Sequence, residues 1–86
     1  MALYKIVFAK RVRKDFRKIP EHDATRLLSA IKLLAADPLP PHSKKLKGEE
    51  LFRIRIGNYR VIYSIEDDRM IVSVVKVGHR KNVYQS

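Results

Sequence analysis

The sequence predicts an α+β fold: an N-terminal strand and a two-helix hairpin pack on an antiparallel β-sheet that ends in a three-stranded meander. Apolar residues follow the helical period of about 3.6 in the first half of the chain and the strand period of about 2 from Leu51 onwards. Two polar turns, Gly57-Asn58 and Asp67-Asp68, divide the second half into strands. A chain of 86 residues supports one core, so we expect a single domain over residues 1–86.

The first element is a short strand over residues 3–8, which are mostly apolar or β-branched. An amphipathic helix follows, because Val12, Phe16 and Ile19 are spaced to form one apolar face and basic residues fill the other sides. Pro20 ends this helix. The outer surface of the helix is therefore expected to be strongly basic.

The second helix begins after Pro20, where Glu21 and Asp23 supply the negative charge that a helix N-terminus favours. The prolines of segment 37–41 stop it, since a proline disfavours helical geometry in the residue before it. Its expected apolar stripe comprises Ala24, Leu27, Leu28, Ile31, Leu34 and Ala35. Two consecutive helices separated by a short break predict a helical hairpin.

The two polar turns also predict which residues face each other in the sheet. About Gly57-Asn58, the expected pairs are Ile56 with Tyr59, Arg55 with Arg60, and Ile54 with Val61. About Asp67-Asp68, they are Ile65 with Met70, Tyr63 with Val72, Val61 with Val74, and Arg60 with Val75. The last strand then ends at Val77, which places Gly78, His79, Arg80 and Lys81 at the same end of the sheet as Arg55 and Arg60.

Alternation along the strands gives the sheet one apolar face and one basic face. The core face is expected to carry Phe52, Ile54, Val61, Tyr63, Ile65, Met70, Val72 and Val74. The other face carries Arg53, Arg55, Arg60, Ile62, Ser64, Ile71, Ser73 and Val75. Arg55 and Arg60 repel each other across the strand pair, and a bound anion would relieve that repulsion. Solubility or edge protection is the alternative explanation for these arginines, and a bulge at the turn would separate the pair.

The charge balance points to an acidic partner, since 19 Lys and Arg against 9 Asp and Glu give a formal net charge of +10. Nucleic acid is the commonest such partner, with an anionic membrane surface or an acidic protein as rivals. Lys44, Lys45 and Lys47 would follow a phosphate backbone, although a lysine run is more often only a solvated segment.

Several other classes of chemistry are disfavoured. The chain has no cysteine, and His22, His42 and His79 lack the spacing of a metal site, so neither a metal nor another cofactor is expected. The 3 glycines do not form a phosphate-binding loop. No stretch approaches the roughly 20 apolar residues of a membrane span, and the start lacks a signal-peptide run, so we expect a cytoplasmic protein.

A set of short motifs occurs in a specific order: Leu46-Lys47-Gly48, Leu51 to Arg55, Asn58 to Tyr63, and Val77 to Arg80 with Val83-Tyr84. Together they resemble the RelE branch of the RelE/ParE toxin superfamily, over essentially the whole chain. The resemblance implies the toxin of a type II toxin–antitoxin system, a metal-independent endoribonuclease that cuts mRNA and stops translation. The implied partners are a cognate antitoxin in a hetero-oligomer, mRNA in the ribosomal A site, and 16S rRNA.

The resemblance also implies site residues. The active-site positions of the family correspond to Arg53, Arg55, Arg60, Arg80 and Tyr84. Arg60 and Arg55 would clamp the phosphate, and Arg80 would face the leaving group. Tyr84 would orient the base or accept the proton. Additional RNA contacts are expected from Lys44, Lys45, Lys47, His79 and Lys81.

The sequence leaves open which residue acts as the general base. Some relatives have lysine at positions 53 and 55, whereas arginine, with a pKa above about 12, is a poor base. Tyr84 is therefore the leading candidate. Two alternative functions also remain: a ParE-like inhibitor of DNA gyrase without ribonuclease activity, and a catalytically inactive fold that only binds nucleic acid. The presence of Arg60, Arg80 and Tyr84 together favours the endoribonuclease.

Overall fold

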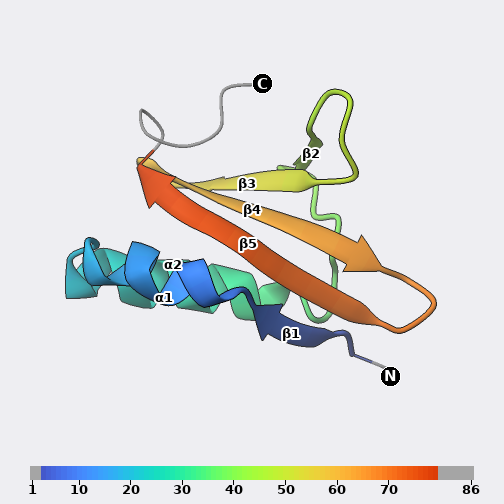
Figure 1. Ribbon diagram of the computed structural model, residues 1–86, viewed down its shortest axis with the longest axis horizontal. Coiled ribbons are helices and arrows are strands. Elements are labelled where there is room, and N and C mark those ends of the chain that lie inside the picture. The colour runs from blue at the N-terminus through green and yellow to red at the C-terminus, as the bar shows by residue number, and fades with distance from the viewer. Residues whose placement is uncertain (1–2, 80–86) are drawn as a thin grey trace.

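The computed structural model describes residues 3–79, in which two helices cover one face of a five-stranded sheet (Figure 1). The elements are β1 (Lys5–Phe8), α1 (Lys10–Arg17), α2 (Glu21–Leu33), β2 (Lys44–Lys45), β3 (Phe52–Ile56), β4 (Tyr59–Glu66) and β5 (Ile71–His79). The strand order is β1-β5-β4-β3-β2. Neighbouring strands are antiparallel except that β1 runs parallel to β5. The α+β class is confirmed, with a mixed sheet in place of a purely antiparallel one.

The two helices form the predicted hairpin. Pro20 occupies the N-cap position of α2, so the expected break is confirmed. Leu27, Ile31 and Leu34 are buried, whereas Leu28 lies at the edge of the apolar stripe and is 39% exposed. Within residues 3–79, neither helix combines the length and apolar character that crossing a membrane requires.

The first hairpin has the predicted register, with Arg55 opposite Arg60 and Ile54 opposite Val61. Gly57 has a φ of 61°, whereas Asn58 is not among the described residues with positive φ. This pattern matches a type II′ turn, which joins two strands directly and requires glycine at its first central position. The glycine therefore fixes the pairing that places the two arginines opposite each other.

The predicted register of the second hairpin is wrong. The observed pairs are Glu66 with Ile71, Ile65 with Val72, Tyr63 with Val74, Val61 with Val77, and Arg60 with Gly78. The loop takes in residues 67–70, with Met70 at a φ of 53°, so Met70 lies in the turn and not on the core face. This longer loop shifts the pairing by two residues, which keeps the side chains of β5 from Ile71 to Val74 on their predicted faces.

A bulge between the pairs of Ile62 and Tyr63 then inserts Val75 as an extra residue in β5. An insertion of one residue reverses the alternation beyond it. Val77 therefore turns into the core, where it is 1% exposed. The strand also continues past Val77 to His79, so its end lies directly beside β4 at the Gly57-Asn58 turn, on the left of Figure 1.

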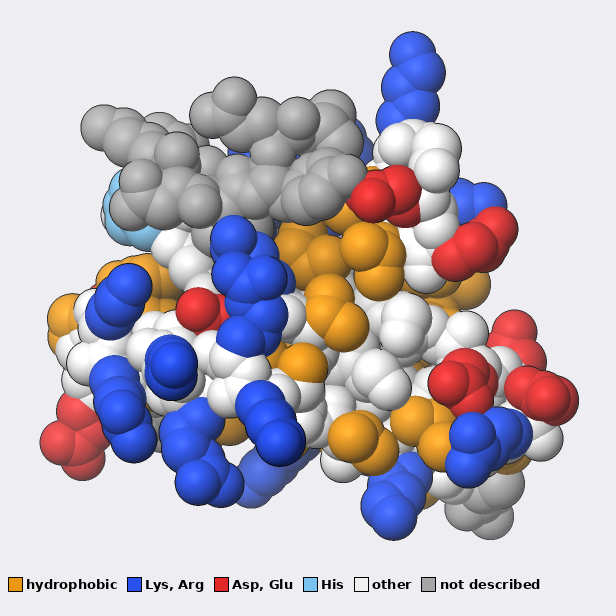
Figure 2. Space-filling model, in the orientation of Figure 1, with side chains coloured by type: hydrophobic (Ala, Val, Ile, Leu, Met, Phe, Trp, Pro, Cys, Tyr) orange, Lys and Arg blue, Asp and Glu red, His pale blue; other side chains and the backbone are white. Residues whose placement is uncertain are grey.

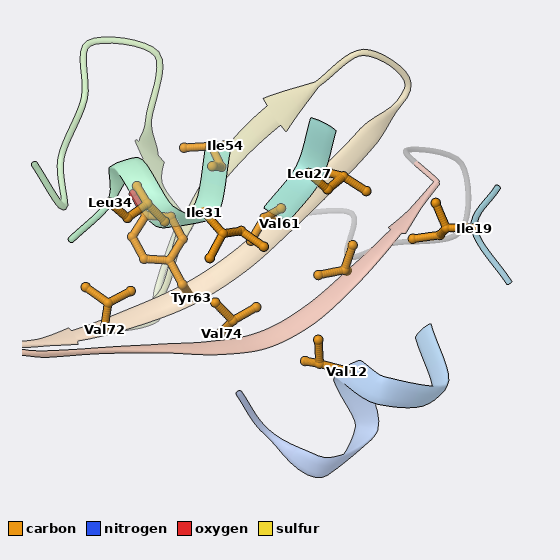
Figure 3. Packing of buried hydrophobic residues seen from close by; sticks show 11 residues of the cluster. Val12, Ile19, Leu27, Ile31, Leu34, Ile54, Val61, Tyr63, Val72 and Val74 are labelled. Atoms are coloured by element: carbon orange, nitrogen blue, oxygen red, sulfur yellow. The ribbon is translucent and has the colours of Figure 1, made fainter. Parts of the chain in front are cut away.

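The core lies between the helices and the sheet (Figure 3). Its buried members are Val12, Ile19, Leu27, Ile31, Leu34, Ile54, Val61, Tyr63, Val72, Val74 and Val77. Tyr63 is fully buried, and its hydroxyl donates a hydrogen bond of 2.7 Å to the carbonyl oxygen of Pro38. This bond ties the proline-rich segment to the centre of the sheet. Burial raises the pKa of Tyr63 to about 12.

We expect Tyr63→Phe to lower the free energy of unfolding by about 1 kcal/mol near neutral pH, because it leaves the Pro38 carbonyl without this donor. The pKa of Tyr63 is higher in the folded protein than in the unfolded chain. As the pH rises, the unfolded chain therefore loses this proton first, above about pH 10. The hydroxyl therefore stabilises the fold fully below about pH 10 and progressively less towards about pH 12. Urea unfolding of the parent and of Tyr63→Phe at about pH 9 and about pH 11 measures this dependence. A difference in unfolding free energy that is the same at both pH values would contradict it.

Candidate functional site

Three arginines share the sheet face that points away from the helices. Arg53 and Arg55 alternate with core residues along β3, and the hairpin register brings Arg60 of β4 directly opposite Arg55. Burial lowers the pKa of Arg53, and the charges of Arg55 and Arg60 lower it further. The Arg53 guanidinium thus lies within the electric field of the other two arginines. We call this surface, together with Lys44, the arginine face.

Lys44 belongs to this surface because of β2, a strand that sequence reasoning missed. The pairing of β2 with β3 places Lys44 opposite Arg53 and Lys45 opposite Phe52. Lys45 therefore shares the face of Phe52, and its ammonium lies 3.8 Å from a carboxylate oxygen of Glu50. Lys47 is exposed in the following loop. Of Lys44, Lys45 and Lys47, the structure brings Lys44 beside the arginines.

A cluster of apolar side chains lies next to the arginine face. Leu46 and Ile62 are buried there, and Leu51 and Val75 pack against them. Ile62 and Val75 were expected on this face, and both are found there. Leu46 is held in place by its N–H, which donates a hydrogen bond of 2.8 Å to the carbonyl oxygen of Leu51. Charged and apolar groups are thus side by side, as a nucleotide with its phosphate and its base would require.

The end of β5 approaches the arginine face through Gly78, which pairs with Arg60. Glycine adds no side chain at this point, so β5 itself places no side chain opposite Arg60. Gly78 and His79 therefore lie at the predicted end of the sheet. Arg80, Lys81 and Tyr84, the other predicted site residues of this segment, lie outside the described residues.

His79 lies on the opposite face from the arginines. It pairs with Tyr59, and the two rings meet edge to face with centroids 5.7 Å apart. Both residues line a groove of about 420 Å³ beside α1, to which Arg11, Lys18 and Lys76 also contribute. The structure therefore separates His79 from the arginine face by the thickness of the sheet.

A larger groove of about 670 Å³ lies between the end of β1 and the two helices. We call it the apolar groove; its lining residues are Phe8, Ala9, Lys10, Val12, Arg13, Phe16 and Leu28. Phe8 is 45% exposed and Leu28 is 39% exposed, so the groove presents apolar surface beside a basic helix. Lys and Arg side chains gather over α1 on this side of the molecule (Figure 2). The even spacing of the stripe in α2 gave no indication that Leu28 lies outside the core.

The chemistry available to the arginine face follows from its residue types. Guanidinium groups bind phosphate through paired N–H donors and stabilise negative charge that develops during a reaction. They do not accept protons near neutral pH. The described part of the face can therefore hold and polarise a phosphodiester, and proton transfer requires a further group.

We expect Arg55→Thr to raise the melting temperature, because a strand-forming neutral residue removes the repulsion between Arg55 and Arg60. The gain should be a few tenths of a kcal/mol up to about 1 kcal/mol. Sulfate should stabilise the parent more than the variant at matched ionic strength, since an anion bound only to the folded state shifts the equilibrium. Lys5→Thr makes the same change of charge at an exposed position of β1, the strand at the other edge of the sheet, and serves as control. Equal melting temperatures and equal sulfate responses of parent and Arg55→Thr would contradict an anion site here.

Comparison with known proteins identifies relatives with the same architecture. A sequence profile of the family described as "ParE toxin of type II toxin-antitoxin system, parDE" matches residues 6–84. "Putative toxin RelE1" of Methanocaldococcus jannaschii is 31% identical, over 96% of this chain and 97% of that protein. The RelE–RelB complex of Pyrococcus horikoshii OT3 superposes with a TM-score of 0.81 at 29% identity, over 93% of this chain and 98% of that one.

The toxin–antitoxin complex RelBE2 of Mycobacterium tuberculosis gives a TM-score of 0.80 at 30% identity, over 91% of this chain and 99% of that one. The match therefore includes the helical hairpin, the sheet and the strands that carry the arginine face. Sequence profile, sequence relatives and structures agree on one group of proteins. The chain belongs to the RelE/ParE superfamily and is the toxin of a type II toxin–antitoxin system.

Proposed function

We propose that this toxin is an endoribonuclease that cuts mRNA in the ribosomal A site. One observation carries the proposal: the β3–β4 hairpin sets Arg55 directly opposite Arg60 and keeps Arg53 within their field. Like charges directly opposite each other on neighbouring strands repel, and a phosphodiester bound between the arginines would offset that repulsion. The relatives named RelE support an RNA-cutting toxin over other members of the superfamily.

The proposed reaction is an attack of a ribose 2′-hydroxyl on the adjacent phosphate. A bond forms between the 2′-oxygen and phosphorus, and the bond from phosphorus to the 5′-oxygen breaks. The products are a 2′,3′-cyclic phosphate and a 5′-hydroxyl. The 2′-hydroxyl loses its proton to a general base, and the 5′-oxygen gains a proton.

The roles of individual residues follow from this reaction. Arg55 and Arg60 hold the phosphate and stabilise the charge that builds up on its oxygens. Arg53 and Lys44 extend the positive surface along the RNA backbone. Arg80 faces the leaving 5′-oxygen, and Tyr84 serves as general base or stacks on the base, as the resemblance implies.

Primer extension on a translated message, shortly after the toxin is induced, tests this proposal. The expected result is a set of cuts in phase with the codons, which disappears when the start codon of the same message is mutated. Inhibition of DNA gyrase was the alternative, and the family profile carries the ParE name. Relaxed plasmid DNA together with intact mRNA would favour that alternative and overturn the proposal.

We also propose that a cognate antitoxin covers this toxin, since the relatives from Pyrococcus horikoshii and Mycobacterium tuberculosis were solved with their antitoxins. The apolar groove offers the binding surface. Its exposed Phe8 and Leu28 suit the apolar side of an amphipathic helix, and Lys10 and Arg13 suit acidic residues on that helix. The groove is built from β1 and the helices, so antitoxin binding and phosphate binding use different surfaces.

A further inference from the structure

Asp15 is the only acidic residue in α1, whose sequence is KRVRKDFR. It lies in the last turn of the helix, where the helix dipole disfavours negative charge. A carboxylate at such a position is explained when it has a partner elsewhere in the fold.

The partner is in β5. One carboxylate oxygen of Asp15, Oδ2, accepts a hydrogen bond of 3.0 Å from the backbone N–H of Val77, a residue that is 1% exposed. A buried backbone N–H without an acceptor is strongly unfavourable. The contact joins α1 to a strand 62 positions further along the chain.

The sheet itself does not supply an acceptor at this point. Among the described residues, β1 pairs with β5 no further than Val74, whose carbonyl oxygen accepts the last bond from the N–H of Ala9. Beyond Val74 the chain of β1 has turned into α1, which packs along the same edge of β5. The Asp15 carboxylate thus replaces the carbonyl group that a longer β1 would have provided.

The stretch of β5 that Asp15 holds is the one that approaches the arginine face. It follows the bulge at Val75, where the pairing between β4 and β5 is interrupted. Gly78, the next residue after Val77, pairs with Arg60. Arg80 comes three residues after Val77 in the sequence.

We propose that Asp15 is a positioning residue, which fixes the end of β5 against Arg60 and thereby aligns the site for cleavage. This inference rests on the proposed ribonuclease function. Asp15 lies on the helix side of the sheet and acts only through the Val77 N–H. Its loss should therefore slow the reaction of bound RNA and leave the binding of RNA-loaded ribosomes unchanged.

Four variants separate the hydrogen bond from the charge. Asp15→Ala removes the acceptor, Asp15→Asn keeps an oxygen acceptor without charge, and Asp15→Glu keeps the charge on a longer side chain. Asp68→Ala makes the same change of charge in the exposed β4–β5 loop and is the control. Two quantities are measured: the hydrogen exchange rate of the Val77 amide by NMR, and the single-turnover cleavage rate as a function of ribosome concentration.

For Asp15→Ala we expect exchange at Val77 to accelerate about tenfold or more, and the saturating cleavage rate to fall about tenfold, with the half-saturating ribosome concentration unchanged. Asp15→Asn should stay close to the parent, and Asp15→Glu should shift in the direction of Asp15→Ala. Should Asp15→Ala not fold, the contrast between Asp15→Asn and Asp15→Glu gives the same answer.

Unchanged exchange at Val77 in both Asp15→Ala and Asp15→Glu would overturn the anchoring contact. An Asp15→Asn variant as slow as Asp15→Ala, or an effect only on the half-saturating concentration, would overturn the positioning role. If the parent itself does not cut RNA, the proposed function fails, and the exchange rate of Val77 still decides whether Asp15 anchors β5.

Discussion

Arg60→Ala should reduce the rate of mRNA cleavage by about 100-fold or more, because it removes a fixed cation from the phosphate in the transition state. The same substitution relieves the repulsion with Arg55, so the protein should remain folded. Arg60→Lys should recover part of the rate, since lysine keeps the charge and loses the paired N–H donors of arginine. The measurement is the single-turnover cleavage rate at saturating ribosome concentration.

Lys32→Ala is the matched control for Arg60→Ala. It also removes one positive charge, from an exposed position on α2 outside the arginine face, and should change the saturating rate less than about twofold, as a screened surface charge would. Cleavage by Arg60→Ala at the rate of the parent would remove Arg60 from the proposed site. A loss of similar size in both variants would assign the effect to net charge.

Leu28→Glu should produce a toxin that its antitoxin no longer neutralises. The substitution places a carboxylate in the apolar groove, where it would be desolvated by the apolar face of the antitoxin helix and would repel its acidic residues. Leu28 is already 39% exposed, so the folded toxin tolerates the charge. We expect binding of the antitoxin to weaken by about 100-fold, with cleavage activity retained.

Leu33→Glu is the control, because Leu33 is also on α2, is 72% exposed, and does not line the groove. The readout is growth after co-expression of each variant with the product of the neighbouring gene, followed by co-purification. Full rescue of the Leu28→Glu variant would show that the antitoxin binds elsewhere. Equal loss of rescue in both variants would point to an effect of charge on the whole helix.

The fold could be predicted where a local signal determines the structure. The helix break at Pro20 and the strand pairing at Gly57-Asn58 follow from the backbone preferences of proline and glycine, and both are confirmed. The pairing of β4 with β5 could not be predicted in the same way. Nothing in Asp67-Asp68 shows that the loop includes Met70, and the bulge at Val75 depends on packing across the sheet.

The candidate site could likewise be predicted only where the sequence carries a local signal. Arg53, Arg55 and Arg60 were placed together from the register of one hairpin, and the structure confirms that placement. Lys44 was missed as a neighbour of Arg53 because β2 is only 2 residues long and has no alternating pattern. The position of His79 depends on the bulge and the extended end of β5, so it was expected beside the arginines and lies on the other face.

The most direct test of the central claim uses purified toxin with purified ribosomes that hold a short mRNA and an empty A site. We expect a single cut within the A-site codon, an upstream fragment ending in a 2′,3′-cyclic phosphate, and loss of the cut in Arg60→Ala. Intact mRNA under these conditions, with gyrase supercoiling inhibited by the same preparation, would contradict it.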